Sequence, residues 1–377
     1  MIEGEIMVNN SRLTDNFKQL VQFNSVSFRE RETADWLIDY LKKLGFQVEE
    51  DNAGEAYGGN AGNIYGFLKG TLPGSPLLFS AHMDVVQPGT GKKAIFNQDG
   101  KITSDGTTVL GADDIAGIVE ILEAVHILKE QRIPHREIEV LFPIGEEAYI
   151  KGTNLFDFSK IHANNAYVLD LSGNVGTAAV QAPSIISFEI ILKGIASHAG
   201  FAPEKGTNAI ALMSLAISKI KQGHIDGETT LNIGTISGGT ATNIVSDIAV
   251  CTGEIRSFNH EKAIECLSTL QEVFEEVTKD TKGTFEIRPD IHMKAYKIEE
   301  SDDVVVQFKK ACEKLNLEGN IINTFGGSDN NNFVVNGLHG VVLSCGMYNV
   351  HSTSEYSTVK DLENGAKLVS QLLSQTE

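Results

Sequence analysis

Seven acidic and histidine side chains of this chain stand where apolar segments come to an end. Five are carboxylates and two are imidazoles: His82, Asp84, Asp113, Glu146, Glu147, Asp170 and His351. If they gathered in one pocket without cations, the carboxylates would repel one another and some would be forced to take up protons. Two divalent metal ions would remove that repulsion, and mixed imidazole and carboxylate ligands suit such ions. The sequence therefore predicts a metal site, provided that the seven side chains converge.

The spacing of these residues indicates what some of them could do. His82 and Asp84 are two apart, so on extended backbone both point to the same side. His82 could then bind a metal while Asp84 orients the imidazole or a neighbouring group. Asp113 and Asp114 begin a long predicted helix, where acids are also favoured by capping and by the helix dipole. One carboxylate of this pair could bridge two metals, because a carboxylate has two oxygens.

The remaining acids and the second histidine follow other apolar strands. Glu146 and Glu147 come directly after one such strand, where open α/β sheets place their ligand crevice. One of the two could bind a metal while the other addresses a bound water. Asp170 ends the next apolar strand and His351 follows the last one. Each side chain alone could be structural, but the repetition at four strand ends indicates a shared site.

Apolar strands that alternate with amphipathic helices predict the scaffold of this site. Strands are expected at 46–49, 63–68, 76–81, 138–144, 166–169 and 341–345, and helices near 13–21, from 30, at 113–129, at 304–315 and after 358. This order predicts an α/β fold with a mostly parallel mixed sheet flanked by helices. Between residues 184 and 294 the pattern changes to alternating or β-branched strands with two helices, which predicts an inserted α+β sandwich. We therefore expect a first catalytic part at 1–183, an inserted domain at 184–294 and a second catalytic part at 295–377.

Composition narrows the class of protein. With 377 residues, 41% of them hydrophobic, the chain is long enough for two domains with real cores. Its net charge of −19 argues against nucleic acid and anionic membranes as partners. No run of 18 apolar residues is present, the N-terminus does not look like a secretory signal, and the four cysteines form no C-x-x-C pair. We expect a cytoplasmic protein with reduced thiols.

Six motifs together resemble the dinuclear zinc aminopeptidase, carboxypeptidase and deacylase superfamily, and in particular its peptidase T-like members. The motifs follow in the expected order: Ser-Ala-His82-Met-Asp84, Leu-Gly-Ala-Asp113-Asp114, Gly-Glu146-Glu147, Leu-Asp170, Ser-His198-Ala-Gly and Asn-Val-His351-Ser. The resemblance covers nearly the whole chain and implies the zinc-exopeptidase type of fold.

The resemblance also implies a role for each residue of the site. His82 and Asp170 would hold one zinc ion, Glu147 and His351 the other, and Asp113 would bridge the two. Cobalt or manganese would accept similar ligands, so the spacing does not distinguish them from zinc.

Two further residues and one peptide bond complete the implied site. Glu146 would be the general base and Asp84 an orienting residue outside the metal shell. The bond between Asp113 and Asp114 would be cis, as in relatives. Ile115 departs from the family pattern, because many relatives carry lysine after the aspartate pair.

The inserted domain resembles the lid of that superfamily, which can also support a homodimer. His198 would reach over the reacting carbonyl, in its own or a partner's cleft. Asn243 could donate to the developing oxyanion or to the substrate, and Arg256 could pair with a substrate carboxylate. The glycine-rich turn before Asn243 and a surface position of Arg256 offer plainer explanations.

The expected function is hydrolysis of short peptides by a metallopeptidase, with a tripeptide aminopeptidase as the first expectation. A hydroxide bridging the two metals would attack the peptide carbonyl while Glu146 handles the proton. A carboxypeptidase or an N-acyl-amino-acid deacylase with the same dinuclear site is an open alternative. A metal-stabilised binding protein without catalysis is a second one.

Overall fold

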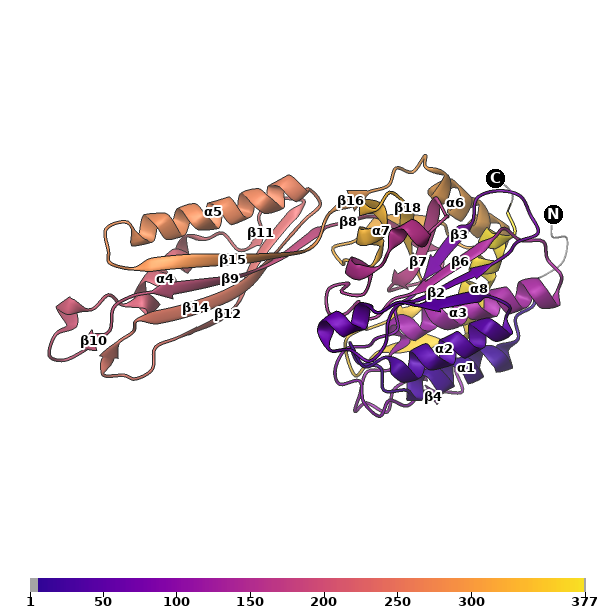
Figure 1. Ribbon diagram of the computed structural model, residues 1–377, viewed down its shortest axis with the longest axis horizontal. Helices are drawn as coiled ribbons and strands as arrows, with labels where there is room; N and C mark the ends of the chain where they lie inside the picture. The colour runs from indigo at the N-terminus through magenta and orange to yellow at the C-terminus, as the bar shows by residue number, and fades with distance from the viewer. Residues whose placement is uncertain (1–5, 376–377) are drawn as a thin grey trace. The chain divides into compact units, whose positions relative to one another are not determined.

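The computed structural model describes residues 6–375, which form two compact units (Figure 1). Unit 1 contains the residues up to 181, residues 297–324 and the residues from 328 onward. Unit 2 contains residues 182–296 and 325–327. The expected inserted domain at 184–294 falls inside unit 2. Its function as a lid stays a prediction.

A nine-stranded mixed sheet forms the middle of unit 1. Its order is β1-β2-β6-β3-β7-β18-β8-β16, and β17 pairs with β8. The central strands β6, β3, β7 and β18 run parallel, while β1 and β2 add an antiparallel edge. The strands are β1 (Gln47–Glu50), β2 (Ile64–Leu68), β3 (Leu77–Ser80), β6 (Ile138–Phe142), β7 (Asn165–Leu171), β8 (Thr177–Ala182), β16 (Tyr296–Lys297), β17 (Asn320–Asn323) and β18 (His339–Ser344). The predicted α/β class with a mostly parallel central sheet is therefore confirmed.

Helices and loops cover both faces of this sheet. The helices of unit 1 are α1 (Asn10–Gln22), α2 (Arg31–Lys43), α3 (Ala112–Glu130), α6 (Asp303–Leu315), α7 (Asn330–Val335) and α8 (Val359–Leu373). On one face α3 packs against α1, α8 and β7, and the Tyr167 hydroxyl donates to the Val304 carbonyl of α6. On the other face Phe333 of α7 and Phe156, which follows the residues of η2 (Thr153–Leu155), belong to one buried cluster with Leu78 of β3. Because β3 and β6 are buried along their whole length, they need no polar alternation.

A small antiparallel sheet and several single-turn helices complete unit 1. The sheet has the order β19-β20-β5-β4. Its strands are β4 (Ile95–Phe96), β5 (Lys101–Thr103), β19 (Met347–Tyr348) and β20 (Tyr356–Thr358), and the short helices are η1 (Ala53–Tyr57), η2 (Thr153–Leu155) and η3 (Phe158–Lys160). Neither this sheet nor β8, β17 and α7 is predicted by the sequence patterns, because these segments are short or lack a periodic apolar pattern.

Unit 2 is a five-stranded antiparallel sheet with two helices packed on it. The strand order is β11-β12-β14-β9-β15, and a separate two-stranded pair joins β10 to β13. Its elements are β9 (Ser184–Lys193), β10 (Ser197–His198), η4 (Pro203–Lys205), α4 (Ala209–Lys219), β11 (Gly223–His224), β12 (Thr229–Gly238), β13 (Ile244–Val245), β14 (Ile248–Ser257), α5 (His260–Thr278) and β15 (Thr284–Met293). Phe188 of β9, Met213 of α4 and Phe274 of α5 belong to one buried core. The expected α+β character of this region agrees with these elements.

None of the helices formed by residues 6–375 is long and apolar enough to cross a membrane.

Candidate metal centre

The carboxyl ends of the central parallel strands bring the predicted residues together. Ser80 of β3 lies opposite Leu141 of β6 and Val168 of β7, so these strands end at one edge of the sheet. His82 follows β3 by two residues, and Asp170 lies in the last part of β7. Glu146 and Glu147 follow β6, and His351 comes after β18 and β19. The crevice at this edge is where open α/β sheets bind ligands.

Asp113 lies between the two histidines of the site. Its Oδ1 is 3.0 Å from His82 Nε2, and its Oδ2 is 3.2 Å from His351 Nε2. His351 Nε2 is also 3.0 Å from Glu147 Oε1. One carboxylate thus presents a separate oxygen to each imidazole. This geometry is what a carboxylate shared by two metal ions requires.

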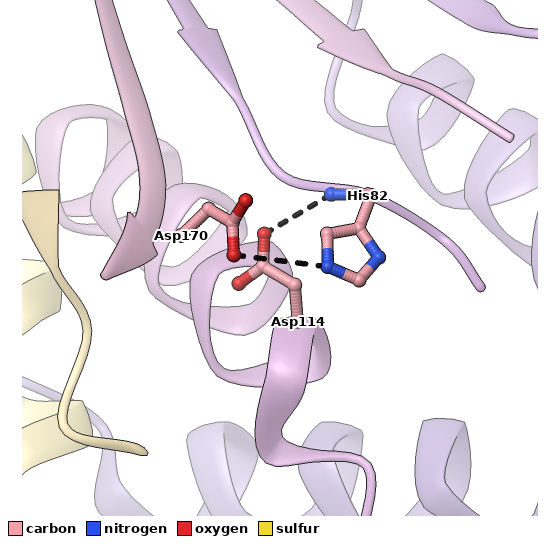
Figure 2. Close-up of side chains that lie close together, drawn as sticks. All are labelled: His82, Asp114 and Asp170. Carbon is pink, nitrogen blue, oxygen red and sulfur yellow. Dashed lines mark hydrogen bonds and ion pairs between the residues drawn. The ribbon is translucent and has the colours of Figure 1, made fainter. Parts of the chain in front are cut away.

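Asp170 and Asp114 complete the surroundings of His82 (Figure 2). Asp170 Oδ1 lies 3.8 Å from His82 Nε2, and Asp114 Oδ2 accepts the backbone N–H of His82 at 3.0 Å. The other oxygen of Asp114 is 3.7 Å from the Cys345 thiol. Asp114 lies within metal-binding distance of His82 and Asp170, but both of its oxygens have partners in the chain. It therefore supports the backbone of His82.

The start of α3 has an unusual backbone. The peptide bond between Asp113 and Asp114 is cis, as the resemblance implied, and neither residue has helical torsion angles. Gly111 precedes them with φ of +78°, a left-handed conformation that favours glycine. This turn lets Asp113 face the two imidazoles while Asp114 faces the backbone of His82.

Asp84 holds a backbone segment as well as a histidine. The Nδ1 of His82 lies 2.9 Å from the backbone carbonyl of Asp84. Since a carbonyl oxygen only accepts, Nδ1 carries a proton, and Nε2 is the ring nitrogen that faces Asp113 and Asp170. The carboxylate of Asp84 accepts the amides of Glu146 at 2.9 Å and Glu147 at 3.2 Å and the hydroxyl of Ser27 at 2.7 Å. The expected orienting role thus extends to the Glu146–Glu147 backbone.

The charges of the site fit a pair of divalent cations. Burial and the neighbouring Asp170 carboxylate raise the pKa of Glu146 well above its usual range, and burial followed by the charge of Asp113 raises the pKa of Glu147. Glu147 Oε1 is buried and has no hydrogen bond of acceptable geometry, although His351 Nε2 is close to it. Imidazole nitrogens that face carboxylates, a buried carboxylate oxygen without a hydrogen bond and crowded acids form a donor set that suits divalent metals.

Two family models match consecutive parts of the chain. Residues 63–180 match peptidase family M28, and residues 181–282 match the peptidase dimerisation domain. The uncharacterized protein YqjE of Bacillus subtilis is 38% identical over 363 residues, which cover 96% of this chain and 98% of that protein.

Two solved structures extend the likeness to the whole fold. A tripeptidase from Staphylococcus aureus has a TM-score of 0.94 and 34% identity over 98% of each chain. The aminopeptidase PepT from Bacillus cereus has a TM-score of 0.91 and 38% identity, covering 97% of this chain and 98% of its own. This chain is a peptidase T-like metallopeptidase. It belongs to a superfamily of metal-dependent enzymes.

In unit 2 of this peptidase T-like chain, His198 lies in a short two-stranded pair and Asn243 directly precedes the partner strand. His198 of β10 is paired with Ile244 of β13, and the Asn243 carbonyl accepts the amide of Ala199. The exposed His198 ring accepts the amides of Gly200 and Phe201 at Nδ1, at 3.1 and 3.2 Å. Its neutral form therefore carries hydrogen on Nε2, which leaves that atom available as a donor.

Arg256 lies on β14 and is partly engaged within unit 2. Its Nε donates to Glu254 at 2.6 Å and its Nη1 to the Phe325 carbonyl at 2.7 Å. Among the described residues Nη2 has no hydrogen-bonding partner. These contacts would hold the guanidinium in place while leaving one nitrogen for a ligand.

Three buried acids near the metal centre were not foreseen as parts of the site. Glu30 accepts the amide of Gly145, Glu355 accepts the amide of Asp113, and Asp329 accepts the hydroxyl of Thr153. Burial raises the pKa of Glu30 to about 8 and those of Glu355 and Asp329 to about 7. The position of Glu355, four residues after a histidine of the site, offered one signal. The segment 326–329, which ends at Asp329, offered another, because it resembles the superfamily's loop beside the catalytic cleft, although a plain turn explains it equally well. A lone acid at a helix start, such as Glu30, is read from sequence as a helix cap.

Proposed function

We propose that this chain is a metal-dependent tripeptide aminopeptidase. The observation that carries the proposal is the Asp113 carboxylate between two imidazoles, beside the buried Glu146 and the partly buried Glu147. The solved relatives at 34% and 38% identity, named a tripeptidase and an aminopeptidase, support the substrate class.

The proposed metal ligands divide the acids and histidines into two sets that share one residue. His82 and Asp170 would hold one ion, Glu147 and His351 the other, and Asp113 both. Two zinc ions are proposed, and cobalt or manganese would accept the same nitrogen and oxygen ligands. When bound, such ions lower the pKa of water and polarise the substrate carbonyl.

Glu146 is the proposed general base. Its amide is fixed by Asp84, so its side chain starts from a defined point next to the ligand Glu147. A carboxylate oxygen of Glu146 would take the proton of the attacking water and later deliver it to the leaving amine nitrogen. The low exposure of Glu146 excludes competing water from that transfer.

The substrate contacts are proposed for unit 2. The Nε2–H of His198 would donate to the carbonyl oxygen as negative charge develops there. Asn243 would donate an amide hydrogen to the same oxygen or to the peptide. Arg256, held by Glu254 and the Phe325 carbonyl, would pair through Nη2 with the C-terminal carboxylate of a short peptide and thereby limit its length.

A substrate panel tests the function. Tripeptides, dipeptides, N-acyl amino acids and C-terminally blocked tripeptides are offered to the purified protein with and without a chelator. We expect release of the N-terminal residue from tripeptides, loss of the activity with chelator and its return with zinc. Release of the C-terminal residue would indicate a carboxypeptidase, cleavage of acyl amino acids a deacylase, and no hydrolysis with full metal content a binding protein.

A homodimer through unit 2 is a further part of the proposal. Leu215 of α4 and Ile236 at the free edge of β12 are 48% and 56% exposed, and both elements line one shallow depression. The match of residues 181–282 to a peptidase dimerisation domain supports a second copy of this chain as the occupant. Light scattering of an Ile236→Lys variant tests it, with a monomer as the expected result.

The four free cysteines support the cytoplasm as the proposed location.

A further inference from the structure

The backbone that carries Glu146 and Glu147 is held by buried side chains through its amides, while the carbonyls of residues 143–146 accept backbone amides of residues 83 and 150–152. Four consecutive amides, from residue 144 to residue 147, each donate to a side-chain oxygen. The pairs are Ile144 to Asn63 Oδ1 at 3.1 Å, Gly145 to Glu30 Oε1 at 3.1 Å, Glu146 to Asp84 Oδ1 at 2.9 Å and Glu147 to Asp84 Oδ2 at 3.2 Å. Asn63, Glu30 and Asp84 are all fully buried. No regular element fixes this segment, so these three side chains hold its amides in place, together with the backbone hydrogen bonds to its carbonyls.

Glu30 is the unexpected member of this set. It occupies the position before the first residue of α2, where an acid normally caps the helix. Its side chain makes no cap, and instead Oε1 accepts the amides of Phe28 at 2.7 Å and Gly145. The plain explanation, a helix cap, therefore fails for this carboxyl group.

The two amides that Glu30 holds belong to residues that pack closely and that both have left-handed backbone. Phe28 has φ of +67° and Gly145 has φ of +58°, both in the left-handed region. A Cβ at Gly145 would lie 2.7 Å from the Phe28 ring, so the two residues are tightly packed. A non-glycine residue in this conformation persists only where the surroundings enforce it. The shared carboxyl group supplies that constraint immediately before Glu146.

The segment that carries Glu30 also supports Asp84. Ser27 donates its hydroxyl to Asp84 Oδ2, and the Ser25 carbonyl accepts the amide of Val85. Residues 25–30 therefore include Glu30 and also contact Asp84, which are two of the three side chains that accept the amides of residues 144–147.

Keeping a carboxyl group at position 30 costs stability. Oε2 of Glu30 is buried without a hydrogen-bonding partner among the described residues, and Asp84 adds a neighbouring negative charge. An apolar side chain of similar volume would avoid that cost. An apolar side chain, however, could not accept the amide of Gly145.

We propose that Glu30 is a positioning residue for the general base: by accepting the amides of Phe28 and Gly145 it sets the direction from which Glu146 reaches the substrate. The inference rests on the proposed role of Glu146 in peptide hydrolysis. Glu30 itself touches neither substrate nor metal, so its effect is on turnover and not on metal content.

Three substitutions at position 30 test this role. Glu30→Gln keeps an acceptor oxygen at the same reach, Glu30→Asp withdraws it by one methylene, and Glu30→Leu removes it. The matched control is Glu120→Leu, because Glu120 is also fully buried and neither of its oxygens has a hydrogen-bonding partner among residues 6–375, so it holds no amide of residues 144–147. For each variant we would measure kcat and KM on a tripeptide, the metal content and the unfolding midpoint.

We expect kcat to fall about 10- to 100-fold in Glu30→Leu and Glu30→Asp, with KM and two metals per chain retained, since a small misplacement of a catalytic group has effects of this size. Glu30→Gln should stay within about fivefold of the native kcat, and Glu120→Leu should keep it. If Glu30→Leu does not fold, the comparison of kcat in Glu30→Asp with kcat in Glu30→Gln tests the role.

Three results would overturn the inference: native kcat in Glu30→Leu or Glu30→Asp, an equal loss in Glu30→Gln and Glu30→Asp, or a loss that merely follows lost metal. A native protein that hydrolyses no peptide would instead refute the proposed function, before any variant is compared.

Discussion

Glu355 and Asp113 are joined by a buried hydrogen bond that links two parts of the metal centre. Oε1 of Glu355 accepts the amide of Asp113 at 3.0 Å, and Oε2 accepts the amide of Gly111 at 2.8 Å. Glu355 follows His351 by four residues, so the loop carrying one proposed ligand holds the backbone of the shared one. The position of the Asp113 backbone relative to the loop of His351 therefore depends on this carboxyl group.

Replacing Glu355 by alanine should weaken metal binding. Two buried amides would lose their acceptor, at a cost of about 1–3 kcal/mol each, and Asp113 would lose its fixed position. We expect metal affinity to fall about 10- to 100-fold. Calorimetric titration of the metal-free protein with zinc measures it, and Glu313→Ala, which removes an exposed acid of α6, is the control. An unchanged affinity in Glu355→Ala would refute the linkage.

Glu146→Gln should separate metal binding from turnover. The amide of glutamine neither takes up nor delivers a proton, so kcat should fall by about two to four powers of ten. Metal content should stay at the native value, because Glu146 is not among the proposed ligands. The measurement pairs tripeptide turnover with elemental analysis of the same sample. Full activity of this variant would exclude Glu146 as the base, whereas Glu313→Gln should behave as the native chain.

The sequence predicted the scaffold better than the supports of the site. Periodicity located α3 and the buried strands β3, β6 and β7, because long apolar patterns report burial directly. It missed β8, whose Thr177–Ala182 is rich in alanine, and β17, which has four residues. Motifs at strand ends located the acids and histidines that the structure brings together. Glu30 and Glu355 escaped, since their partners are backbone amides that no sequence pattern records.

The tautomer of His198 leads to a prediction about its donor. Nδ1 accepts two backbone amides, so the hydrogen of the neutral ring should be found on Nε2. Nitrogen-15 chemical shifts of the ring measure this directly. His198→Ala should lower kcat/KM by about 10²–10³, as expected for a lost oxyanion donor, without loss of metal. His224→Ala, which removes another exposed histidine of unit 2, should have no such effect. A proton on Nδ1, or native kcat/KM in His198→Ala, would contradict the role.

A glycine at a helix–helix contact should respond to substitution in the opposite direction from most helical glycines. Gly365 lies in α8, where alanine would ordinarily stabilise by roughly 0.5–1 kcal/mol. A Cβ at this position, however, would overlap the carboxyl group of Glu120 on α3. We expect Gly365→Ala to destabilise the chain by about 1–3 kcal/mol, as overpacked cores do.

The double variant isolates the cause of that loss. Glu120→Ala removes the overlapping group together with a buried carboxyl whose pKa burial raises well above its usual range. In chemical unfolding, Gly365→Ala should therefore be less harmful in the Glu120→Ala background than in the native one, by about 1 kcal/mol or more. Gly227→Ala, at a position with open space, is the control for added methyl groups. Equal losses in both backgrounds, or a more stable single variant, would mean that α3 and α8 are packed less tightly than the contact implies.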